Sequence, residues 1–201
     1  KLKIQFSESS LAFYRNRSLI KTCHDFPEQP RSIFQAYNSS HSNWQQIVFN
    51  KIKSLPPICP LAFYKTRIWE LNFQELCDTF FRKRILTFLD LPSSSGRQAI
   101  DIDASIRTLL LSNVEKITLT PRVFSSIVFA RVSNFKIYGE ISFIEKETFK
   151  SLRRMRLLEF SIKNWRKLFH RGIHWIRDLN SHIRVDLTNK SSILVADLPF
   201  Q

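Results

Sequence analysis

The stretch from Ile141 to Asn164 constrains the fold more than any other part of the sequence. An amphipathic helix would alternate apolar steps of three and four residues, and a half-buried strand would keep steps of two. Here the steps are three, five, three, three, three and two, at Ile141, Ile144, Phe149, Leu152, Met155, Leu158 and Phe160. The spacing predicts a turning segment that shortens into a strand near Phe160, with all seven side chains in the core.

Four segments after residue 100 share the pattern apolar-x-apolar-x-Asn. They are Leu109–Asn113, Ala130–Asn134, Phe160–Asn164 and Val185–Asn189, and their asparagines are 21, 30 and 25 residues apart (134 − 113, 164 − 134 and 189 − 164). In repeats of this length, alternate apolar side chains enter a shared core, and an asparagine ending the strand can bond backbone groups of the turn. The pattern predicts short parallel strands at 109–112, 130–133, 159–162 and 185–188.

These patterns resemble the extracellular, phenylalanine-containing type of leucine-rich repeat, clearly over about residues 100–190. Phe149 stands where that type carries its inward-pointing phenylalanine, whereas one residue rather than two precedes each asparagine. The resemblance implies an α/β fold, a right-handed solenoid or horseshoe with short parallel strands on its concave side and irregular N-terminal repeats. It assigns 1–91 to degenerate repeats or a cap, 92–99 to a loop, and 100–201 to repeats with a terminal coil. An unrelated α/β domain is the alternative.

The charge of the chain favours acidic partners. Lysine and arginine exceed aspartate and glutamate by 31 − 17 = 14 over 201 residues. Ten basic residues between Lys150 and Arg184 stand against Glu159 and Asp178, a local excess of 10 − 2 = 8. Nucleic acid, anionic lipid, a sulfated glycan or an acidic protein would all fit such a surface. Only three glycines are present, which argues against glycine-rich nucleotide-binding loops.

The resemblance implies a non-catalytic scaffold that binds a protein or another ligand. It would be an ectodomain fragment, extracellular or at the cell surface, with a preference for acidic ligands such as an acidic glycan. The outward residues of the predicted strands are the ligand-binding candidates: Arg131, Ser133, Glu159, Ser161, Lys163, Arg184, Asp186 and Thr188, together with Leu110 and Ser112. A basic nucleic-acid-binding module is the alternative, because aromatic residues are interleaved with the basic ones between 150 and 184.

No residue is assigned to catalysis, to a cofactor or to a metal. His170 and His174 would share one face of a helix, but the metalloprotease pattern requires a glutamate where Arg171 stands. An enzyme using these histidines with Asp178 is a further alternative. Asp101 and Asp103 alternate with two isoleucines, which predicts a strand with both carboxylates on its exposed face.

Several features bear on the cellular compartment. Sequons at Asn16, Asn38 and Asn189 are candidate glycosylation sites and favour an extracellular surface. Of Cys23, Cys59 and Cys77, the last two would close the shorter disulfide loop, and three free thiols are the alternative. No apolar run reaches the roughly 18 residues of a membrane span, so membrane contact is expected only through segments outside this chain. The start of the sequence resembles neither a methionine start nor a signal peptide, so a longer parent protein is expected. The oligomeric state is not assigned.

Overall fold

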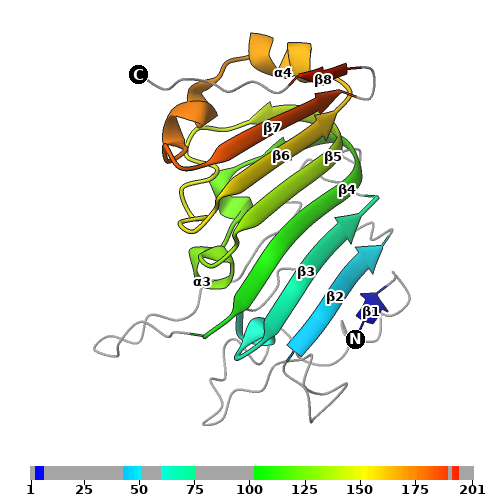
Figure 1. Cartoon of the computed structure of the whole chain (residues 1–201), viewed down its shortest axis with the longest axis vertical. Helices are drawn as coiled ribbons and strands as arrows, with labels where there is room; N and C mark the ends of the chain where they lie inside the picture. The colour runs from blue at the N-terminus through cyan, green and yellow to red at the C-terminus, as the bar shows by residue number, and fades with distance from the viewer. Residues whose placement is uncertain (1–2, 7–42, 51–59, 76–101, 190–191, 195–201) are drawn as a thin grey trace.

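The computed structural model describes residues 3–6, 43–50, 60–75, 102–189 and 192–194, which form one sheet with short helices beside it (Figure 1). The strands are β1 (Lys3–Phe6), β2 (Asn43–Asn50), β3 (Arg67–Gln74), β4 (Ser105–Leu119), β5 (Asn134–Ile144), β6 (Leu157–Ile162), β7 (Arg184–Asn189) and β8 (Ser192–Leu194). The helices are η1 (Pro60–Phe63), η3 (Pro121–Val123), α3 (Ser126–Phe129), α4 (Trp165–His170) and η4 (His174–Asp178). The described part is therefore mostly strand, with less helix than the predicted α/β class implies.

The spatial order of the strands follows the chain from β1 to β8. Every neighbouring pair from β1 to β7 is parallel, and β8 alone runs antiparallel to its neighbour β7. Parallel neighbours need a connection that returns the chain to the same end of the sheet. The pairing of β3 with β4 carries the sheet across the predicted division near residue 92, and the predicted loop at 92–99 lies outside the described residues.

Two rows of core side chains run across the sheet in register. The first row is Leu71, Leu109, Phe135, Leu158 and Val185, and the second, two residues further along each strand, is Phe73, Leu111, Ile137, Phe160 and Leu187. Members of both rows from β3 to β6 are 0–1% exposed. The predicted parallel strands at 109–112, 159–162 and 185–188 are thereby confirmed. The step from Leu71 to Phe73 is equivalent to the step from Leu158 to Phe160.

The strand predicted at 130–133 is wrong. Residues 130–133 form a turn after α3, in which the Val132 amide donates to the Phe129 carbonyl at 3.0 Å, and β5 begins at Asn134. The strand's two core positions are Phe135 and Ile137, so Asn134 opens a strand instead of closing one. The Phe160–Asn164 motif is likewise offset by two residues, because Leu158, not Phe160, pairs in the first core row.

The stretch from Ile141 to Phe160 packs largely as its spacing predicts. All seven apolar side chains are buried, with exposed fractions between 0% for Ile141 and 4% for Met155. The strand β6 begins at Leu157, where the apolar steps shorten. Ile141 and Ile144 differ from the prediction, because they belong to the second half of β5. They are not part of the returning segment, the stretch 145–156 that leads from the end of β5 back to the start of β6.

A bend in β4 and β5 gives both strands two halves. The register between them shifts after Leu111, and both Asn113 and Lys116 have positive φ, at 54° and 50°. Gly139 of β5 pairs with Val114 at a φ of 141°. A Cβ at position 139 would lie 2.1 Å from the Val114 carbonyl oxygen, so only glycine allows the two backbones to approach this closely. Figure 1 shows β4 curving along its length.

An aromatic stack fills the space between the sheet and the returning segments. Phe124, Phe149 and Trp175 recur at intervals of 25 and 26 residues (149 − 124 and 175 − 149). Ring centroids are 6.1 Å apart for Phe124 and Phe149 and 5.8 Å apart for Phe149 and Trp175. Phe135 and Phe160 of the sheet pack against this stack from β5 and β6. The predicted inward orientation of Phe149 is confirmed by its 3% exposure.

Candidate functional site

The side of the sheet opposite the core carries mostly polar side chains from β2 to β7. Side chains alternate along a strand, so the residues between and beyond the two core rows point away from the core. We call this surface the open face; the registers place on it Val48, Asn72, Leu110, Lys136, Glu159 and Asp186 in one row, and Gln74, Ser112, Tyr138 and Ser161 near the next. Among the candidates, Glu159, Ser161 and Asp186 therefore lie together, and Thr188 pairs with Ser161 by register.

Glu159 is the centre of a hydrogen-bonded cluster on the open face. Its Oε2 lies 2.8 Å from the Lys136 Nζ, and its Oε1 accepts a hydrogen bond from the Tyr138 hydroxyl at 2.8 Å. The hydrogen bond to Glu159 raises the pKa of Lys136 above 10.5. Burial, followed by the hydrogen bond to Glu159, raises the pKa of Tyr138 above 10.0. Sequence reasoning missed Lys136 and Tyr138 because it ended the strand at Asn134.

The cluster predicts a specific alkaline titration. Both pKa values are raised in the folded protein, so the cluster's contribution to stability is present below about pH 10 and is lost as the pH rises further. Glu159→Gln is expected to lower the pKa of Tyr138, because the neutral amide does not repel a tyrosinate. Ultraviolet absorbance of tyrosinate measures this, with Ser161→Ala as the control on the same face. An unchanged titration in Glu159→Gln would contradict the contact.

Other cross-strand contacts organise the remainder of the open face. The Ser112 hydroxyl donates to the Asn72 Oδ1 at 2.9 Å, and the Gln46 amide donates to the Glu70 Oε1 at 2.6 Å. The Arg184 Nε lies 2.8 Å from the Asp186 Oδ1 within β7. The neutral and charged side chains from β2 to β4 are therefore held in place by a partner on the adjacent strand, and Asp186 by a partner on its own strand.

Trp69 is the large aromatic side chain that the open side of β3 presents to solvent, with 53% of its surface exposed. It stands between the core residues Ile68 and Leu71, which are separated by two residues instead of one. The Arg107 guanidinium of β4 lies over its ring, 3.9 Å from the centroid. Exposed tryptophan and arginine are the residue types that dominate binding energy at protein interfaces. Neither residue belongs to the strands predicted from the repeated asparagine motif in a position that would mark it as a binding candidate.

Arg131 and Ser133, predicted on a strand, lie instead before the start of β5. The Ser133 hydroxyl donates to the Arg107 carbonyl at 2.9 Å. Arg131 and Arg67 both pair with Asp103, with nitrogen–oxygen distances of 2.5 and 3.0 Å. The hydrogen bond from Arg131 lowers the pKa of Asp103, and the charge of Arg67 adds to the effect. The predicted strand through Asp103 is wrong, because β4 begins at Ser105 and Asp103 has a φ of 47°; Asp101 lies outside the described residues.

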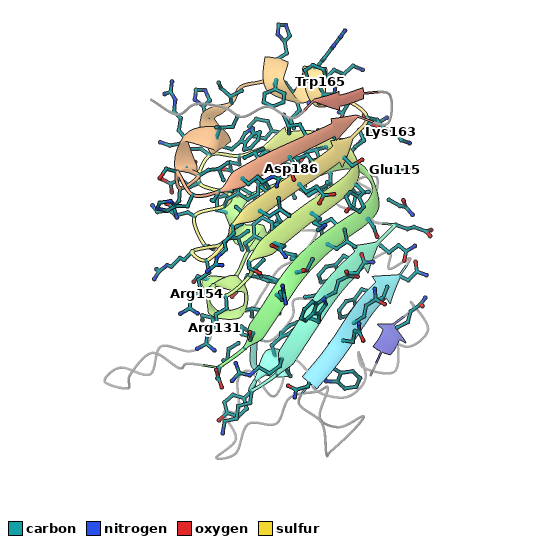
Figure 2. The ribbon with its side chains drawn as sticks, in the orientation of Figure 1. Glu115, Arg131, Arg154, Lys163, Trp165 and Asp186 are labelled. Carbon is teal, nitrogen blue, oxygen red and sulfur yellow. The ribbon has the colours of Figure 1, made fainter. Side chains whose placement is uncertain are left out.

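The basic segment between Lys150 and Arg184 does not form one surface. Arg154 precedes β6, whereas Lys163 follows it and leads into α4 with Trp165. Figure 2 shows Arg131 and Arg154 at one end of the strands and Lys163 and Trp165 at the other. Lys163 therefore lies one residue beyond β6, at the opposite end of the strands from Arg131 and Arg154, and its predicted role in binding stays a prediction. The structure divides a continuous basic stretch between the two ends of the sheet.

No protein-family model matches this sequence, and no curated protein or solved structure matches the chain. The site must therefore be interpreted from its own residues.

The histidines of the enzyme alternative do not share a helix face. The helix α4 ends at His170, and His174 begins η4 after the intervening Gly172, which has a φ of 118°. Asp178 accepts a hydrogen bond from the Glu147 amide. Among the described residues, no three histidine, cysteine, aspartate or glutamate side chains are grouped so that they could hold a metal ion. Within the same ranges, no helix is long and apolar enough to cross a lipid bilayer.

Several predictions about the cellular compartment fall outside the described residues. These are the sequons at Asn16 and Asn38 and the cysteines Cys23, Cys59 and Cys77. Asn189 ends β7, where its backbone pairs with Ser192 of the antiparallel β8. The asparagine of the third sequon therefore lies at the end of β7.

Proposed function

We propose that this chain is a non-catalytic binding scaffold of the leucine-rich-repeat type, a solenoid whose open face receives a partner macromolecule. It would belong to a longer extracellular or cell-surface protein, as the sequons and the resemblance indicate. The observation that carries the proposal is the open face itself. One side of the sheet is buried against the core, and the other presents ordered polar side chains beside the exposed Trp69.

The arrangement of the strands supports the repeat interpretation. Successive strands from β1 to β7 are parallel and lie in chain order, which is expected when each repeat stacks on the preceding one. The motif apolar-x-x-apolar-x-apolar recurs in register at Ile68, Ile106, Val132 and Met155, each named by its first residue. Asn164 adds a further contact between repeats, because its amide Nδ2 donates to the Ile141 carbonyl at 2.9 Å.

The hydrogen-bonded side chains of the open face support a role in binding. Residues on a solvated face need no partners, yet Lys136, Tyr138 and Glu159 are held together across two strands. Side chains already fixed in position lose less conformational entropy when a partner binds. A face of this kind favours recognition of a shaped protein surface with charges of both signs.

Site-directed photo-crosslinking tests the proposal. A photo-reactive amino acid is placed at Ser161 on the open face and, as the matched control, at the exposed Ser126 of α3. Cells that produce the full protein are irradiated, and covalent adducts are identified by mass spectrometry. We expect one predominant protein adduct at Ser161 that is absent at Ser126. Equal adducts at both positions, or none at Ser161, would refute the open face as the binding surface.

A basic nucleic-acid-binding module is the second candidate. The observation in its favour is the exposed Trp69 with Arg107 over its ring, since aromatic rings and arginine together bind single strands. Nucleic-acid binding has a steep dependence on salt, because phosphate contacts release counterions. Adducts to nucleic acid rather than protein at Ser161 would favour this candidate.

A further inference from the structure

Arginines recur at the beginning of successive strands. Three of them stand immediately before the first apolar residue of the repeated motif: Arg67 before Ile68, Arg131 before Val132, and Arg154 before Met155. Three more lie at the starts of strands: Arg107 is the third residue of β4, Arg156 immediately precedes β6, and Arg184 begins β7. We call the set the arginine rim; it comprises Arg67, Arg107, Arg131, Arg154, Arg156 and Arg184.

Backbone hydrogen bonds join the starts of β4 to β7, and three of the four residues that they link are rim arginines, with Ser133 between Arg107 and Arg156. The Ser133 amide donates to the Arg107 carbonyl at 3.0 Å, and the Arg156 amide donates to the Ser133 carbonyl at 2.8 Å. The Arg184 amide in turn donates to the Arg156 carbonyl at 2.9 Å. Residues that are 77 positions apart in sequence (184 − 107) therefore follow one another across the starts of β4 to β7.

The rim keeps a positive charge after its internal ion pairs are counted. Asp103 forms ion pairs with both Arg67 and Arg131. In β4, which lies between β3 and β5, Ser105 pairs with Arg67 and so takes the position of a rim arginine. Asp186 forms an ion pair with Arg184. Six arginines less these two carboxylates leave a net charge of 6 − 2 = +4. Arg154 and Arg156 are exposed and make no ion pair with any residue that the structure describes.

The length of the rim sets the size of its occupant. From β3 to β7 there are four inter-strand steps of about 4.8 Å, a span of about 19 Å. An extended peptide rises about 3.3 Å per residue, so about six residues would cross the rim. Guanidinium groups bind carboxylates through two parallel hydrogen bonds, a geometry that an ammonium group does not offer.

The geometry points to an acidic segment of a partner protein, about six residues long, bound along the arginine rim. This inference rests on the proposed scaffold function and identifies the chemistry of its partner. Protein is favoured over single-stranded nucleic acid because single strands use successive stacking rings, and Trp69 is the one aromatic side chain more than half exposed in the described part of the chain. Glu70, Glu159 and Asp186 adjoin the rim on the open face, so the acidic segment is expected to follow the starts of the strands and not to extend onto that face.

Fluorescence anisotropy with a labelled oligoglutamate peptide of about eight residues tests the inference. The rim variant Arg107→Gln, Arg154→Gln, Arg156→Gln is compared with the full chain at low salt. Removing three arginines is expected to weaken peptide binding about 10-fold or more. The matched control is Lys163→Gln, Arg166→Gln, Lys167→Gln, which removes the same charge at the opposite ends of the strands. We expect it to weaken binding less than about 2-fold.

Replacing the same three rim residues by lysine separates charge from geometry. This variant keeps the charge but loses the paired donors of the guanidinium, so we expect an intermediate loss of about 3-fold. Circular dichroism confirms that each variant is folded. Equal losses in the rim and control variants, or no peptide binding by the unaltered chain, would overturn the inference. So would displacement of the peptide by an oligothymidine of about twelve nucleotides or by heparin at about 0.15 M salt, which would assign the rim to that polyanion.

Failure of the inference and failure of the scaffold proposal give different results. If the rim variants bind the peptide unchanged while Ser161 still crosslinks one protein, the partner docks on the open face without an acidic segment. If the rim binds the peptide while Ser161 gives no adduct, the rim is a separate site and the open face is not the binding surface.

Discussion

Phe149→Ala is expected to lower the free energy of unfolding by about 3–5 kcal/mol, the cost typical of emptying an aromatic site in a packed core. The Phe149 ring contacts Phe124 on one side and Trp175 on the other, with Phe135 of the sheet beside it. Its removal leaves a cavity that joins three successive returning segments. Since rings from several segments share this part of the core, the loss affects more than one segment. Urea denaturation followed by tryptophan fluorescence measures the change.

Phe143→Ala is the matched control for this substitution. It deletes the same ring from a residue of β5 that is 40% exposed, so we expect a loss of about 1 kcal/mol or less. Phe149→Leu should recover most of the stability, because it retains much of the volume in the cavity. Equal destabilisation by Phe143→Ala and Phe149→Ala would show that the stack is not part of the core.

The burial of Phe149 could be predicted from the sequence, but its place in a recurring stack could not. The apolar spacing from Ile141 to Phe160 predicts this burial, because steps of three to five residues indicate a turning chain and a step of two indicates an extended one. Phe124 and Trp175 are equivalent to Phe149 only after the strands are aligned, because a tryptophan replaces the phenylalanine and few flanking leucines mark the repeat. The intervals of 25 and 26 residues between these aromatic residues are visible in the sequence, but only the strand register shows that the three positions are equivalent.

The error at 130–133 arose from aligning the repeats on their asparagines. An asparagine can open a strand, follow a bend or bond a neighbouring strand, and the three occur here at Asn134, Asn113 and Asn164. The two core residues of each strand are a more reliable guide to the alignment, because burial of one side of the sheet requires apolar side chains at alternate positions. The pair Phe135 and Ile137 would have placed β5 correctly and added Lys136 and Tyr138 to the candidate site.

The sequence indicated the charge of the candidate site more reliably than its position. Glu159 and Asp186 were placed on the open face because the strands β6 and β7 were located closely enough. The arginine rim is formed by residues within β3, β4 and β7 and by residues that precede β5 and β6, and parallel pairing brings together arginines that are far apart in the chain. A local window therefore attributes the basic excess to residues 150–184, although Arg67 and Arg107 also belong to the assembled surface.

Gly139→Ala is the second substitution with a large expected effect. The added Cβ would lie 2.1 Å from the Val114 carbonyl oxygen and 2.7 Å from the Val114 amide nitrogen, and the φ of 141° disfavours any side chain. Strain of the backbone costs about 1–3 kcal/mol and overpacking costs about as much again, so we expect roughly 3–5 kcal/mol of destabilisation. The second halves of β4 and β5 would separate, which exposes the buried Ile117 and Ile141.

Gly172→Ala separates the two contributions to this effect. Gly172 also has a positive φ, at 118°, but its Cβ would meet only the movable His174 ring, at 3.3 Å. It should therefore cost only the backbone strain, about 1–3 kcal/mol. Hydrogen exchange of the Ile141 amide reports whether the loss in Gly139→Ala is confined to the bend. If Gly139→Ala were no more destabilising than Gly172→Ala, the close approach of β5 to Val114 would be refuted, and with it the bend that turns both strands around the core.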